Sequence, residues 1–146
     1  MIVNKAMISF CRVFCFFPNF VTNYDHFYME DEKLYDLAFL NKISGGDPEF
    51  IHEMISTFKE IAPDYLLKAK KLLNDQEIDA LSKETHRIIP GVSFLGARQL
   101  EADLMLIEEY TKKNENLDLV HVLIDSVDDK INRLIQIFDR DFNGAL

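Results

Sequence analysis

His86 carries an imidazole that could do chemistry, although its spacing alone is also that of an ordinary exposed helix residue. A neutral imidazole keeps a free lone pair near neutral pH, so it can act as a nucleophile. His86 directly follows Thr85, which belongs to a series of positions spaced three and four residues apart, the pattern of a helix core seam. One residue along a helix is a rotation of about 100°, which places His86 off the buried stripe and in water. The seam consists of Ile78, Leu81, Thr85, Ile88, Val92 and Leu95.

The helix face around His86 is mostly small and apolar. A solvated helix face normally carries charged side chains, so an apolar stripe in this position indicates that a partner docks on it. The predicted docking residues are Ser82, Lys83, Arg87, Ile89, Pro90, Gly91 and Ser93.

Two further motifs pair a carboxylate with a histidine at helical spacing, Glu49-x-x-His52 and Asp118-x-x-His121. Glu-x-x-His motifs in helical bundles hold di-iron centres when they are repeated and joined by two further carboxylates. The full ligand set is absent here, and each histidine adjoins an apolar position, at the boundary of a helix face. We interpret both as surface or boundary histidines, with a metal-binding bundle as an alternative that the metal content of the purified protein would test.

The elements that position these residues are helices. From residue 36 onward the apolar spacing is helical, and no stretch alternates as a half-buried strand would. Four long amphipathic segments with short connections predict an all-α fold: an antiparallel up-down four-helix bundle with a short extra N-terminal helix. Three of the expected helices cover about 36–43, 48–74 and 98–113. Another begins after 74–75 and carries the His86 seam, and the last begins after 114–116.

Glycine, aspartate and proline mark the predicted helix ends. Gly45 and Gly46 should end the short first helix, because glycine readily adopts the left-handed conformation. Asp47 is a suitable N-cap for the next helix, and Pro48 suits its first position, where no N–H is needed. Pro63 is expected to bend or split that helix.

The acidic composition limits the classes of partner. With 146 residues the chain is long enough for one domain with its own core. A formal charge of −9 repels the phosphates of nucleic acids and anionic lipids, so we expect neither nucleic acid nor a membrane as a partner. The only cysteines, Cys11 and Cys15, lie near the N-terminus, which leaves the rest without a disulfide framework and suits a reducing cytoplasm.

The first 28 residues differ in composition from the rest. The apolar run Met7–Phe17 is too short to span a bilayer as a helix, which needs about 20 residues. Arg12 interrupts the run and no small-residue cleavage site follows, so we do not expect a secretory signal. Met29 precedes a polar stretch and would be a natural domain start, which divides the chain into an extension, 1–28, of uncertain role and a bundle, 29–146.

The stretch from Thr85 to Ala97 resembles the signature of histidine-phosphotransfer domains. In that family an apolar residue lies two positions after the phosphorylatable histidine, and a Gly-Ala pair lies ten and eleven positions after it. Ile88, Gly96 and Ala97 match these positions.

The flanking sequence is similar to the same family. Residues Leu37–Gly46 and Asp47–Phe50 look like its short first helix and the Gly-Gly-Asp-Pro entry to its second, and Ala62-Pro63 fits the same region. The resemblance covers about residues 31–141.

Two positions depart from the family pattern. A lysine usually lies three residues after the histidine and a glycine four after it, whereas this chain has Ile89 and Pro90. Lys83, Arg87 or a basic group of the partner could supply the missing cation, although Arg87 points about 100° away from His86. Pro90 has no N–H for the His86 carbonyl, so a kink is expected there.

The resemblance implies a phosphocarrier without turnover of its own. His86 would accept a phosphoryl group from the aspartate of one response-regulator receiver domain and pass it to another, with a hybrid histidine kinase among its partners. The Mg²⁺ would belong to the receiver, so the chain is expected to hold no cofactor or metal. The lost lysine leaves open a second hypothesis, a bundle that docks receivers without carrying phosphate.

Overall fold

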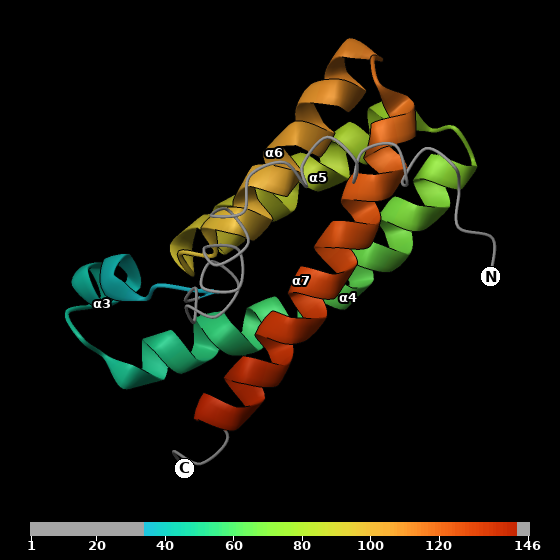
Figure 1. Ribbon diagram of the computed structural model, residues 1–146. Helices are drawn as coiled ribbons and strands as arrows, with labels where there is room; N and C mark the ends of the chain where they lie inside the picture. The colour runs from blue at the N-terminus through green and yellow to red at the C-terminus, as the bar shows by residue number, and fades with distance from the viewer. Residues whose placement is uncertain (1–33, 143–146) are drawn as a thin grey trace, which may run out of the picture. The chain divides into compact units, whose positions relative to one another are not determined.

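The computed structural model describes residues 34–142, which form five α-helices (Figure 1). The predicted extension 1–28, with its two cysteines, lies outside the described residues. No helix in the described part of the chain is both long and apolar enough to cross a membrane. The helices are α3 (Ala38–Ser44), α4 (Pro48–Asn74), α5 (Ile78–Phe94), α6 (Arg98–Lys113) and α7 (Leu117–Phe142).

The predicted caps of the first two helices are confirmed. Gly45 ends α3 in the left-handed conformation, with a φ of 65°. The Asp47 carboxylate accepts the Glu49 N–H at 3.0 Å, and Pro48 occupies the first turn of α4. The prediction that Pro63 could split this helix is wrong, since α4 is one helix from Pro48 to Asn74.

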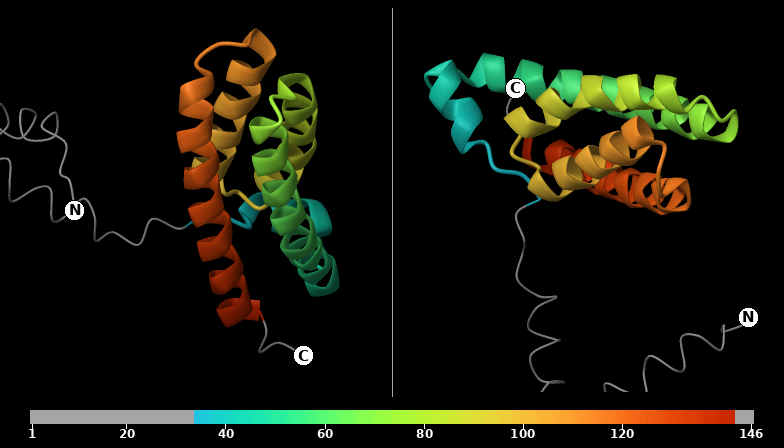
Figure 2. Two further views of the ribbon diagram at one scale, coloured as in Figure 1. Left: turned by 90° about the vertical axis from the view of Figure 1, so that its right-hand side faces the viewer. Right: turned by 90° about the horizontal axis from the view of Figure 1, so that it is seen from above.

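The four long helices form a closed ring in which α4 contacts α5, α5 contacts α6, α6 contacts α7, and α7 contacts α4. Short loops join successive helices, so neighbours along the chain run in opposite directions (Figure 2). The fold is therefore the predicted all-α up-down bundle, with α3 as the extra N-terminal helix.

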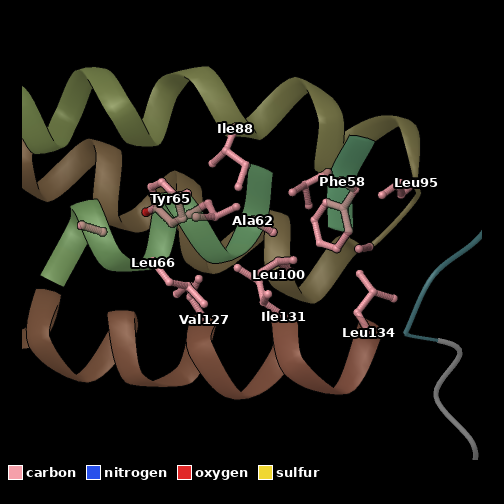
Figure 3. Close-up of a cluster of buried hydrophobic side chains, with 14 of the residues drawn as sticks. Phe58, Ala62, Tyr65, Leu66, Ile88, Leu95, Leu100, Val127, Ile131 and Leu134 are labelled. Atoms are coloured by element: carbon pink, nitrogen blue, oxygen red, sulfur yellow. The ribbon is translucent and has the colours of Figure 1, made fainter. Parts of the chain in front are cut away.

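The core fills the space inside this ring with aliphatic and aromatic side chains. Figure 3 shows Ile88 of α5 pointing inward among residues of α4 and α7 such as Tyr65 and Val127. Phe58 and Phe138, both almost fully buried, meet edge to face with ring centroids 6.1 Å apart. Because the buried stripe of α5 faces this core, the opposite face of α5 is left on the surface.

The tight loop between α5 and α6 is fixed by the segment before α3. The Asp36 N–H donates to the Leu95 carbonyl at 3.1 Å. Gly96, with a φ of +63°, lies so close that a Cβ there would be 2.2 Å from the Asp36 carbonyl oxygen. Only glycine fits both the backbone conformation and this approach, which explains one position of the Gly-Ala pair.

Candidate functional site

His86 lies on the surface of α5. Its neighbour Thr85 and the next seam residue Ile88 are buried, whereas 70% of the His86 side chain is exposed. The prediction that the imidazole faces water is therefore confirmed. One ring nitrogen remains open to an approaching group, and the other is held by a neighbouring helix.

Glu108 of α6 holds the imidazole ring. Its Oε1 lies 2.8 Å from His86 Nδ1, and its side chain is only 13% exposed. Lys112, one turn further along α6, donates to the same oxygen. The hydrogen bond from Lys112, assisted by the one from His86, lowers the pKa of Glu108 against the opposing effect of burial. Glu108 is therefore an ionised acceptor near neutral pH.

This carboxylate determines the tautomer of His86. An ionised carboxylate can only accept a hydrogen bond, so Nδ1 must be the donor in the contact. The proton of the neutral ring then lies on Nδ1, and the lone pair lies on Nε2, at the far side of the ring from Glu108. The exposed ring nitrogen is thus the one whose lone pair could act as a nucleophile.

Two contacts define how α5 and α6 are aligned. Ser93 donates to Glu101 and His86 donates to Glu108, and both pairs fit one antiparallel register. The same register places Met105 opposite Ile89, next to the histidine. Met105 is 55% exposed and lies three residues before Glu108, so it presents an apolar side chain on the same face of α6 as Glu108.

One predicted docking residue needs correction. Ser82 is buried, with only 7% of its surface exposed, because α5 packs against both α4 and α6 and its buried arc is wider than the seam alone. Its side chain therefore offers little to a partner.

The other predicted docking residues lie at the surface to different degrees. Lys83, Arg87 and Pro90 are exposed, whereas Gly91 and Ser93 are half-buried. Ile89 is also half-buried and packs against the core. The guanidinium of Arg87 pairs with Glu84 at 3.0 Å, and Ser93 is engaged with Glu101 on α6. The structure thus gathers six of the seven predicted residues on the accessible side of α5.

Thr85 anchors α5 from inside the bundle. Its Oγ1 lies 3.1 Å from the Tyr65 hydroxyl of α4, and both side chains are buried. Burial raises the pKa of Tyr65 to about 12, so its hydroxyl stays protonated across the physiological range. This bond fixes the rotation of α5 at the residue just before His86.

Pro90 lies within α5, which continues to Phe94. Proline has no N–H, so it cannot close the helical hydrogen bond to the His86 carbonyl four residues earlier. The residue that carries the exposed imidazole therefore also carries a carbonyl that lacks its usual helical donor.

The residues of the alternative metal site do not form a ligand cluster in the part of the chain that the structure describes. His52 and His121 are both exposed. Among residues 34–142, no group of three or more His, Cys, Asp or Glu side chains lies where it could share a metal ion. The two carboxylate-histidine motifs therefore do not combine into a ligand set in this part of the chain.

Sequence reasoning missed Glu108, which contacts His86, Lys112, which shares the Glu108 oxygen, and Met105, which the helix register places nearby. The spacing of Glu108 and Lys112 is a recognisable sign of an ion pair within one helix. That sign does not connect the pair to His86, because the connection depends on the register between two helices.

A family match agrees with this geometry. The Hpt domain family model matches residues 53–137, more than half of the chain and including His86, Glu108 and Lys112. No curated protein and no solved structure matched the chain. Taken with the helical bundle and the exposed histidine, the match shows that the chain belongs to the Hpt domain family, the helical phosphocarrier modules of phosphorelay signalling.

Proposed function

We propose that His86 is the phosphorylated residue of this domain and that its Nε2 atom carries the phosphoryl group between receiver domains. The observation that carries the proposal is the pairing of a 70% exposed imidazole with a mostly covered carboxylate at its Nδ1. An exposed Nε2 can reach a partner, and the Nδ1 contact keeps the Nε2 lone pair available.

The atoms and electrons of the transfer step balance between the imidazole of His86 and the aspartyl phosphate. The Nε2 lone pair attacks the phosphorus of an aspartyl phosphate, the N–P bond forms, and the P–O bond breaks with its electrons leaving on the aspartate carboxylate. The Nδ1 proton stays on the ring, which becomes cationic. Glu108 Oε1 accepts the hydrogen bond from this N–H, so the positive charge on the ring develops beside a negative one. The reverse reaction passes the group to a second receiver.

Phosphoryl transfer needs in-line positioning and charge neutralisation rather than covalent help from the protein. We assign the Mg²⁺ and the acceptor aspartate to the receiver domain, with a hybrid histidine kinase as the source of phosphate. The function requires a compartment that contains receivers, and we place the chain in the cytoplasm.

The receiver would dock over α5 and α6 around the histidine. Ile89, Pro90 and Met105 supply apolar contact area, and Lys83 and Arg87 supply charge at the edge of the surface. A small apolar centre with a charged rim is the usual anatomy of a transient protein interface. Met105→Asp should therefore weaken receiver binding while leaving the bundle folded, because Met105 is exposed.

The decisive experiment is label transfer from a ³²P-phosphorylated receiver to the full chain. We expect acid-labile, base-stable label on the wild-type chain and none on His86→Gln. His121→Gln is the matched control, since it removes another exposed histidine of the bundle and should leave labelling unchanged. Equal labelling of wild type and His86→Gln would reject His86 as the carrier.

The second hypothesis, a receiver-docking bundle that carries no phosphate, is favoured by one observation, Ile89 at the family's lysine position. The same experiment separates the two functions. A wild-type chain that binds the receiver in a pull-down but takes no label would support docking alone and overturn the phosphocarrier proposal.

A further inference from the structure

The amine of Lys112 and the imidazole of His86 share one acceptor, the Oε1 oxygen of Glu108. His86 Nδ1 and Lys112 Nζ both donate to Glu108 Oε1, so two hydrogen bonds separate the ammonium from the ring. Lys112 is on α6, opposite the turn of α5 that precedes His86. Its side chain is 61% exposed, so the amine can move without unpacking the bundle.

A phosphoryl group on His86 would need a cation near it. Phosphorylation adds close to two negative charges and three acceptor oxygens, and this chain already has a formal charge of −9. Ile89, one turn after the histidine on α5, is neutral. Arg87 points round the helix and pairs with Glu84 at 3.0 Å.

We propose that Lys112 supplies this cation from the neighbouring helix, moving from Glu108 to the phosphoryl oxygens once Nε2 is phosphorylated. This inference rests on the proposed phosphorylation of His86 and identifies how the charge of the product is balanced.

The move of Lys112 from Glu108 to the phosphoryl group follows from the charges of Glu108, Lys112 and phosphorylated His86. Before phosphorylation Glu108 has Lys112 as its cationic partner, and the hydrogen bond from Lys112 contributes most to its lowered pKa. After phosphorylation the ring itself is cationic and keeps its bond to Glu108. Lys112 then faces a group with more charge and more free acceptor positions than the carboxylate.

The chain offers a matched control for Lys112. Lys113 is the next residue of α6, is similarly exposed, and bonds to Glu109 at 2.6 Å across one helical turn, as Lys112 does to Glu108. Lys112→Gln and Lys113→Gln therefore remove the same charge and the same kind of ion pair. Lys83→Gln tests the rival cation one turn before His86 on α5.

The experiment uses the full chain phosphorylated with phosphoramidate, a small donor that needs no receiver. The ³¹P resonance of phospho-His86 is identified by its loss in His86→Gln, and its pH titration is followed in each variant. A nearby cation favours the dianion, so we expect Lys112→Gln to raise the titration midpoint while Lys113→Gln leaves it unchanged. Ile89→Lys, which places an amine on α5, should reverse the shift in the Lys112→Gln background.

The exchange with a phosphorylated receiver gives a second readout. At equilibrium, Lys112→Gln should leave roughly fivefold less label on this chain relative to the receiver, the size expected of a partly exposed charge pair. An unchanged midpoint in Lys112→Gln, an equal shift in Lys113→Gln, or a shift found only in Lys83→Gln would overturn the role of Lys112. If a phosphorylated receiver does not label the chain, the proposed function is rejected. If the ³¹P titration midpoint of phospho-His86 still depends on Lys112 in that case, the assignment of Lys112 as the cation stands.

Discussion

His86 and Glu108 lie opposite each other because each is eleven residues from Ala97, on either side of the loop that joins α5 to α6. Two antiparallel helices with the same rise per residue bring such positions to the same height, and here the side chains meet at 2.8 Å. The orientation of the imidazole thus depends on the packing of two helices. A change in the length of the loop would separate the histidine from its carboxylate.

Glu108→Ala should slow phosphoryl transfer to His86. Without the carboxylate the proton can occupy either ring nitrogen, and the cationic ring of the product loses its partner. We expect about a tenfold lower rate from a phosphorylated receiver, measured by rapid-quench label transfer. Glu109→Ala, at the exposed neighbouring position, should transfer at the wild-type rate. Equal rates in both variants would mean that Glu108 does not orient the ring.

The loss of stability in acid should depend in part on the Glu108 carboxylate. The folded-state pKa of Glu108 is lowered from 4.5, so the folded chain binds this proton less tightly than the unfolded chain. Its contribution to stability is therefore fully present above the unfolded pKa and is lost as the pH falls through the folded one. In urea titrations from about pH 6 to 3, Glu108→Gln should lose less stability than wild type. Parallel curves for the two proteins would contradict this assignment.

The helices were predictable because their signals are local. Asp47 with Pro48 begins α4, Gly45 ends α3, and the apolar periods of α4 to α7 match their buried faces. The sequence predicts Ser82 at the surface because one seam describes contact with a single neighbouring helix, whereas α5 packs between α4 and α6. Glu108 was missed because periodicity assigns a residue to a face and says nothing of its height relative to another helix.

Gly96→Ala should destabilise the bundle more than Gly45→Ala does. Both glycines have a φ near +65°, so alanine costs about 1–2 kcal/mol at either position. Only Gly96 has a neighbour where the Cβ would lie, the Asp36 carbonyl at 2.2 Å, while a Cβ at Gly45 meets nothing within 4 Å. The difference in free energy of unfolding between the two variants measures the close contact of Asp36 with the loop. Equal losses would show that this contact relaxes at no cost.

The buried bond between Tyr65 and Thr85 should appear as a coupling in a double-mutant cycle. Tyr65→Phe leaves the Thr85 hydroxyl without its buried partner, and Thr85→Val does the same to Tyr65, so each should cost about 1–2 kcal/mol. The double variant should cost clearly less than the two added together, because it buries no unsatisfied hydroxyl.

Alkaline unfolding gives an independent check on Tyr65. Burial raises its pKa from the ordinary value of 10.0 to about 12, so the folded state holds the proton more tightly. The contribution of this hydroxyl to the free energy of unfolding is fully present below the unfolded pKa. It is lost as the pH rises from about 10 towards 12. Tyr65→Phe removes the titrating group and should flatten this fall, as measured by urea unfolding at increasing pH. An unaltered alkaline slope would indicate that the hydroxyl ionises without opening the contact between α4 and α5.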